Sequence, residues 1–159
     1  RGLGAAALEA GRRHGVPGFL GGDHSISAAT IPAMALRARE AGRPFFVLWL
    51  DAHPDLHTLD TTVSGNLHGT PAAYAMGLGG VEAFPVIAAP VAPAHVCMMG
   101  LRSIDGAEAA RLAALGIDAQ PMADLDHTGV AQPLARFLDR TGVSVFTATP
   151  SVEIGRAHV

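Results

Sequence analysis

Residues 45–55 of the chain read FFVLWLDAHPD, and this stretch is the strongest indication of the fold in the sequence. Its first six residues form a continuous apolar run, which is typical of a strand buried on both faces of a parallel sheet. Three side chains that can bind metal ions, Asp51, His53 and Asp55, follow the run directly. Because ligands bind beyond the carboxyl ends of the strands in such sheets, we expect the chemistry of the protein here.

Helical and strand-like patterns alternate on both sides of this stretch. The predicted helices cover residues 3–13, 25–41, 67–78, 105–115 and 130–140. The predicted strands cover residues 16–20, 45–50, 95–100, 117–122 and a stretch that begins with 143–146. Such an alternation implies βαβ units, so the predicted fold class is α/β, with a mostly parallel sheet and helices on both of its faces.

The composition fits one folded domain. Of the 159 residues, 49% are hydrophobic and 16% are charged, and the net charge is −3. A negative net charge argues against a nucleic-acid binder. No apolar run is as long as the roughly 18 residues that a membrane-spanning helix needs. The single cysteine, Cys97, fits a reducing compartment, and Glu9 and Arg12 stand where a signal peptide would be apolar. We therefore expect a cytoplasmic protein with no nucleic acid and no membrane among its partners.

The donors of residues 51–55 favour a metal site. Asp51, His53 and Asp55 are spaced so that they would project from one side of an extended backbone. Carboxylate oxygen with imidazole nitrogen suits manganese, iron, cobalt, nickel or zinc, and the absence of a thiolate argues against a structural zinc site. Two carboxylates this close need neutralising, and one carboxylate can bridge two metal ions. The alternative is that both aspartates cap turns while His53 packs.

Residues 21–25, GGDHS, offer a further donor, His24, after the predicted strand over residues 16–20. Two glycines before it permit a close approach of the backbone. In the alternative interpretation His24 is structural, and Asp23 or Ser25 is the N-cap of the next helix.

Residues 64–69, SGNLHG, form the third polar motif. His68 could move a proton near the metal site, because histidine titrates near neutral pH. Thr62, Ser64 and Asn66 are short hydrogen-bonding residues that suit a carboxylate ligand. Otherwise they are ordinary residues of a surface loop.

Together, the three motifs resemble the signatures of the ureohydrolase family, and of arginases in particular. The resemblance runs from about residue 21 to about residue 146. It implies that four side chains match four of the six manganese ligands of that family: His24, Asp51, His53 and Asp55. It also implies catalytic roles for Asp55 and for His68, which would relay a proton.

The resemblance also implies a substrate site. Thr62, Ser64 and Asn66 match the residues that hold the α-carboxylate of the substrate. Residues 100–105, GLRSID, resemble the motif whose aspartate, here Asp105, approaches the α-amino group, and Glu108 falls where a second acid sits. His57 replaces the common asparagine of the family, which also contacts the carboxylate.

The fold that this family shares with deacetylases is a three-layer α/β sandwich. The implied function is hydrolysis of L-arginine to L-ornithine and urea with two Mn²⁺ ions, on a small-molecule guanidino substrate. A homo-oligomer, a trimer or hexamer, is implied for the full-length protein.

The family's next Asp-x-Asp pair has no counterpart, because residues 143–150 contain no carboxylate. Asp124 and Asp126 follow a different strand and are interpreted as a helix start or loop. We therefore expect a truncated fold with weak or no activity. The predicted domains are a partial catalytic domain over residues 1–146 and a non-family tail over 147–159, whose end matches a reading frame of a common sequencing adapter.

Three alternatives remain open at this point. The first is a related ureohydrolase that acts on agmatine, guanidinobutyrate or formimidoylglutamate. The second is a non-catalytic metal-binding remnant, and the third is a deacetylase-like zinc hydrolase.

Overall fold

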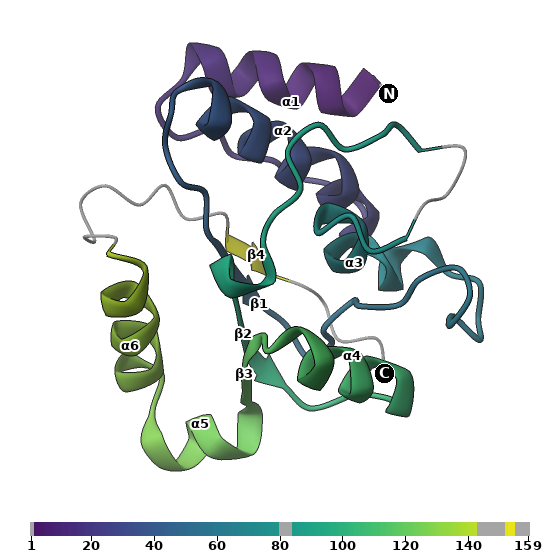
Figure 1. The fold of residues 1–159 in the computed structure, drawn as a ribbon, viewed down its shortest axis with the longest axis vertical. Helices are drawn as coiled ribbons and strands as arrows, with labels where there is room; N and C mark the ends of the chain where they lie inside the picture. The colour runs from purple at the N-terminus through teal and green to yellow at the C-terminus, as the bar shows by residue number, and fades with distance from the viewer. Residues whose placement is uncertain (1, 80–83, 143–151, 155–159) are drawn as a thin grey trace. The chain divides into compact units, whose positions relative to one another are not determined.

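The computed structural model describes residues 2–79, 84–142 and the backbone of 152–154. The chain divides into two compact units (Figure 1). Residues 1–45 and 55–92 form unit 1, and residues 46–54 and 93–159 form unit 2. Residues 46–54 thus supply one strand of unit 2, and the chain returns to unit 1 at residue 55.

Unit 1 is built on two long helices, α1 (Gly2–Arg13) and α2 (Ser27–Glu40), which pack side by side (Figure 1). Both are rich in alanine, which favours helix and permits close packing. Ala7 of α1 is buried in one cluster with Ala33 and Met34 of α2. The helices approach so closely that a side chain at Gly11 would overlap Met34.

Shorter helical elements complete the described part of unit 1. They are η1 (His24–Ile26), η2 (Leu67–Gly69) and α3 (Pro71–Ala75). The single helix predicted over residues 67–78 is therefore divided between η2 and α3. Pro71 explains the division, because proline has no backbone hydrogen with which to continue the preceding helical turn and is well accepted at the start of a helix.

Unit 2 contains a sheet of four strands: β1 (Val47–Leu50), β2 (Val96–Leu101), β3 (Asp118–Pro121) and β4 (Val152–Ile154). The strand order is β3-β2-β1-β4, and every pair is parallel. In the central pair, Val47 lies opposite Val96 and Leu50 lies opposite Met99. The parallel sheet predicted from the alternating pattern is confirmed.

The helical elements of unit 2 are η3 (Pro93–His95), α4 (Gly106–Leu115), α5 (Met122–Thr128) and α6 (Ala131–Thr141), and α4 and α6 lie on opposite sides of the sheet (Figure 1). Leu125 of α5 and Phe137 of α6 form a buried cluster with Cys97 and Met99 of β2. Helix α4 lies on the other side of the sheet from α6, which gives the three layers that the fold class requires.

The strand predicted over residues 16–20 is wrong. This segment is irregular, and the side chains of Val16 and Leu20 are 74% and 103% exposed. Pro17 has no backbone hydrogen to donate to a sheet, and no strand of the described ranges pairs with the segment. The motif at residues 21–25 therefore follows a loop, and His24 begins η1 instead of ending a strand.

Other expectations have mixed outcomes. Helix α5 was not predicted, and it contains Asp124 in its first turn, in agreement with the helix-start interpretation. The strand expected at residues 143–146 lies outside the described residues. The tail over 147–159 also lies outside the described residues, apart from β4, and its origin outside the family stays a prediction.

Among the helices of residues 2–79 and 84–142, none is long and apolar enough to cross a membrane.

Candidate metal centre

The segment after β1 is fixed to β2 by backbone hydrogen bonds. The amide of Asp51 donates to the carbonyl of Met99 (3.1 Å), and the amides of Arg102 and Ser103 donate to the carbonyl of Ala52 (2.9 and 3.0 Å). Between these contacts Gly100 has φ +90°, and a Cβ there would lie 3.3 Å from the Asp51 oxygen. A glycine at this position allows β2 to approach the segment.

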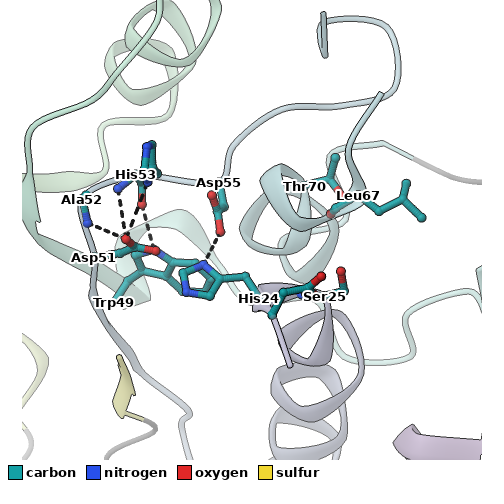
Figure 2. A network of polar contacts seen from close by, with 10 residues as sticks. His24, Ser25, Trp49, Asp51, Ala52, His53, Asp55, Leu67 and Thr70 are labelled. Atoms are coloured by element: carbon teal, nitrogen blue, oxygen red, sulfur yellow. Dashed lines mark hydrogen bonds and ion pairs between the residues drawn. The ribbon is translucent and has the colours of Figure 1, made fainter. Parts of the chain in front are cut away.

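The carboxylate of Asp51 holds its own loop in shape (Figure 2). Its side chain is 2% exposed, and Oδ1 accepts hydrogen bonds from the amides of Ala52 (2.5 Å) and His53 (3.3 Å). The Nδ1 atom of His53 lies 3.8 Å from the same oxygen. The indole of Trp49 donates to the carbonyl of His53 at 3.0 Å. Asp51 and His53, two predicted ligands, are therefore brought together within unit 2.

Asp55 does not continue an extended backbone. Its φ is +48°, the only positive value at a non-glycine residue in the described part of the chain. The expectation that three side chains project from one side of an extended segment is therefore wrong at this residue. Its carbonyl accepts hydrogen bonds from the amides of Ala72 (3.2 Å) and Ala73 (3.3 Å), which stabilise the turn. Left-handed conformations of this kind cost about 1–3 kcal/mol and cluster at functional sites.

His24 and Asp55 meet in unit 1 although 31 residues separate them. The distance from His24 Nδ1 to Asp55 Oδ2 is 2.6 Å (Figure 2). The two side chains are 20% and 7% exposed. This contact joins the motif of residues 21–25 to the motif of residues 51–55.

Asp23 stabilises the start of η1, the element that begins with His24. Its side chain accepts a hydrogen bond from the amide of Ser25 (2.8 Å) and caps η1, as one of the sequence interpretations expected. Hydrogen bonds from the side chain and the backbone of Ser25 lower the pKa of the Asp23 carboxyl below its ordinary value. The carboxylate form, which makes the better cap, is therefore favoured.

The predicted carboxylate-binding residues lie in the loop before η2. The hydroxyl of Thr62 accepts a hydrogen bond from the amide of Gly65 (3.2 Å), and that of Ser64 accepts one from the amide of Asn66 (3.2 Å). A hydroxyl that accepts a hydrogen bond keeps its own hydrogen for donation. Both hydroxyls act as acceptors in these two hydrogen bonds. The bonds therefore orient the hydroxyl oxygens of Thr62 and Ser64 without using the hydroxyl hydrogens.

His57 and His68 also belong to unit 1. The amide of His57 donates to the carbonyl of Gly69 (3.0 Å), which joins the start of this loop to its end in η2. The Nδ1 atom of His57 lies 3.2 Å from the hydroxyl oxygen of Thr61. His68 lies within η2 and is half-buried.

Asp105 and Glu108 form the capping box of α4. Asp105 Oδ1 accepts the amide of Glu108 (2.9 Å), and Glu108 Oε2 accepts the amide of Asp105 (3.4 Å). Both side chains thus stabilise the first turn of a helix in unit 2, and their contact with a substrate stays a prediction.

Sequence reasoning missed three residues that shape these sites: Trp49, Gly100 and Thr61. Trp49 and Thr61 act through side-chain hydrogen bonds that leave no pattern in a sequence. Gly100 had a usable signal, because a glycine after an apolar strand often marks a close approach of backbone.

The arrangement is that of a known class of α/β proteins. An arginase of Bacillus cereus matches the structure with a TM-score of 0.79 and 29% identity, over 88% of this chain and 48% of that chain. An arginase of Bacillus caldovelox matches with a TM-score of 0.76 and 32% identity, over 86% of this chain and 45% of that chain. The fold is thus the α/β fold of the solved arginases.

The sequence comparison gives the family itself. The model of the arginase family matches residues 3–148. An arginase of Agrobacterium fabrum is 55% identical over 159 residues, which are 100% of this chain and 46% of that protein. One of Brucella melitensis is 54% identical over 127 residues, 79% of this chain and 42% of that protein. The chain belongs to the arginase family and spans about half the length of these relatives.

Proposed function

We propose that the chain carries metal-binding and substrate-binding residues of a manganese-dependent hydrolase of guanidino compounds. The proposed reaction converts L-arginine and water to L-ornithine and urea. The observation that carries the proposal is the 2.6 Å contact between His24 and Asp55, because it joins two of the motifs from distant parts of the sequence.

The donor set suits a divalent cation. His24, Asp51, His53 and Asp55 offer imidazole nitrogen and carboxylate oxygen, the ligands that manganese accepts. The aspartate side chains are 2% and 7% exposed, and two buried carboxylates are costly unless a positive charge compensates them. Asp51 and Asp55 are four residues apart, so their Cα atoms cannot be separated by more than about 14 Å. We propose that all four side chains bind two Mn²⁺ ions.

When bound, a pair of such ions would lower the pKa of a water molecule so that hydroxide is available near neutral pH. The chain's own residues would place the substrate. The hydroxyls of Thr62 and Ser64 and the amide of Asn66 would donate hydrogen bonds to the α-carboxylate, with His57 as a further contact. Asp105 and Glu108 would bind the α-amino group.

Cleavage of the guanidinium group needs a proton for the departing amine. Loss of a free amide anion is prohibitive, so a general acid must act as the C–N bond breaks. His68 is proposed for this role, because imidazole exchanges protons near neutral pH.

The test is a calorimetric titration of the chain with Mn²⁺, paired with a urea-release assay on L-arginine. Two sites are expected, and His24→Ala and Asp51→Asn should each weaken binding by more than about tenfold. Asp126→Asn, an exposed aspartate of α5, is the matched control. Binding of no Mn²⁺, or equal binding by wild type and Asp51→Asn, would contradict the proposal.

Parallel assays with agmatine, guanidinobutyrate and formimidoylglutamate test the substrate. Agmatine lacks the α-carboxylate that Thr62, Ser64 and Asn66 are proposed to bind. A preference for L-arginine is therefore expected, and a preference for agmatine would contradict the role of these three residues.

A non-catalytic metal-binding role is the second candidate, and a specific observation favours it. Residues 143–150 contain no carboxylate that could supply the family's remaining ligands. For this chain we therefore expect Mn²⁺ binding with little or no release of urea. Urea release at the rate of an ordinary enzyme would contradict that expectation.

For the full-length protein we propose a cytoplasmic homo-oligomer, a trimer or hexamer.

A further inference from the structure

We propose that Thr61 is a positioning residue, which holds the imidazole of His57 in the tautomer that carries its proton on Nε2. The contact behind this inference lies within unit 1, where Thr61 Oγ1 is 3.2 Å from His57 Nδ1. The inference rests on the proposed function only where it assigns the Nε2 hydrogen to the carboxylate of the substrate.

The direction of this hydrogen bond follows from the acceptors around Thr61. The carbonyl of Thr58 lies 3.3 Å from the Thr61 hydroxyl, but it already accepts the amides of Thr61 (3.1 Å) and Thr62 (3.0 Å). A carbonyl oxygen has two lone pairs, so both are in use. The hydroxyl of Thr58 is more distant still, at 3.4 Å.

The Thr61 hydroxyl is itself held in place. Its oxygen accepts the amide of Thr58 at 3.0 Å, which leaves its hydrogen to be donated elsewhere. Of the three acceptors around this hydroxyl, His57 Nδ1 is the nearest, and the Thr58 carbonyl already accepts two amides. Nδ1 then accepts, and a neutral imidazole that accepts at Nδ1 carries its proton on Nε2.

The chemical consequence is a defined donor. A carboxylate ligand is bound by N–H groups and is repelled by a bare nitrogen lone pair. With Nδ1 occupied by Thr61, the imidazole presents an N–H at Nε2, as the terminal amide of an asparagine would. The backbone bond from His57 to the Gly69 carbonyl (3.0 Å) fixes the residue that carries this donor.

The experiment is a long-range proton–nitrogen correlation spectrum of the chain labelled with ¹⁵N-histidine, read at the alkaline plateau. The His57 signals are identified by their absence from His57→Gln. Wild type should show a protonated Nε2 and an unprotonated Nδ1. Thr61→Ser, which keeps the hydroxyl, should preserve this pattern, and Thr61→Val should give a mixture of tautomers.

A protonated Nδ1 in wild type overturns the proposal, as does an unchanged tautomer in Thr61→Val. The wild-type spectrum decides the tautomer even if Thr61→Val disturbs the loop. The ligand role is tested with L-arginine and agmatine. Thr61→Val should weaken binding of L-arginine by about three- to tenfold and that of agmatine by less than about twofold. Binding of neither ligand contradicts the proposed function and the carboxylate role, while the spectra still decide the tautomer.

Discussion

Position 100 of the chain requires a residue without a side chain. The φ of Gly100 is +90°, and an added Cβ would stand 3.3 Å from the Asp51 carbonyl oxygen. Gly100→Ala is therefore expected to destabilise the protein by about 1–3 kcal/mol, because both backbone strain and a tight contact oppose it. Denaturation by urea measures the change. Gly106→Ala is the control, since no atom would lie within 4 Å of its Cβ, and an equal effect of both substitutions would contradict the argument.

The stability of the protein at alkaline pH is expected to depend on Cys97, whose thiol is buried in the core of unit 2. Burial raises the pKa of its thiol well above the ordinary value, to about 12, and the nearby carboxylate of Asp118 raises it further. The folded chain keeps the proton above pH 9 while the unfolded chain loses it. The free energy of unfolding should therefore fall as pH rises from about 9 towards 12, by up to about 1.4 kcal/mol per pH unit.

The measurement is urea denaturation at pH 8, 9 and 10 with wild type and Cys97→Ala. The pH slope that Cys97 contributes should be absent from the variant, whose overall stability is lower because it leaves a cavity. Equal slopes in the two proteins would show that the buried thiol does not titrate as argued.

At the scale of the element, helix α4 is stabilised at both of its ends. Asp105 and Glu108 form the capping box, and Gly116 ends the helix with φ +61°. Asp105→Ala is expected to lower the free energy of unfolding by about 1 kcal/mol, because the amide of Glu108 loses its acceptor. Asp126→Ala, an exposed position of α5, should change stability by less than about 0.5 kcal/mol. Equal losses of stability in the two variants would contradict a stabilising role for Asp105 as the cap of α4.

The same helix shows which elements a sequence can predict. Residues 105–116 contain their own start and stop signals, so α4 follows from local chemistry. The apolar run of residues 16–20 has no such signals, and a strand also needs a neighbour with free hydrogen-bonding groups. In the candidate site, the spacing of Asp51, His53 and Asp55 predicts a ligand cluster. The left-handed turn at Asp55 could not be predicted, since it depends on the amides of α3.

For the whole molecule, the proposed metal site predicts a dependence of folding on manganese. An ion that binds the folded chain and not the unfolded chain stabilises it by about 2.7 kcal/mol at a concentration 100 times its Kd. For a chain of 159 residues this corresponds to a rise of about 5–10 °C in Tm. The four proposed ligands are separated by up to 31 residues in the sequence, so an unfolded chain does not present them together.

Thermal unfolding with MnCl₂ and with EDTA measures this dependence. Wild type should gain the full increase in Tm with MnCl₂, and EDTA should reverse it. Asp51→Asn should lose most of the increase while its Tm in EDTA stays within a few degrees of wild type, because asparagine keeps an oxygen that can accept the amides of Ala52 and His53. An increase of the same size in Asp51→Asn would mean that manganese binds elsewhere, and the assignment of the metal centre to residues 24 and 51–55 would fall with it.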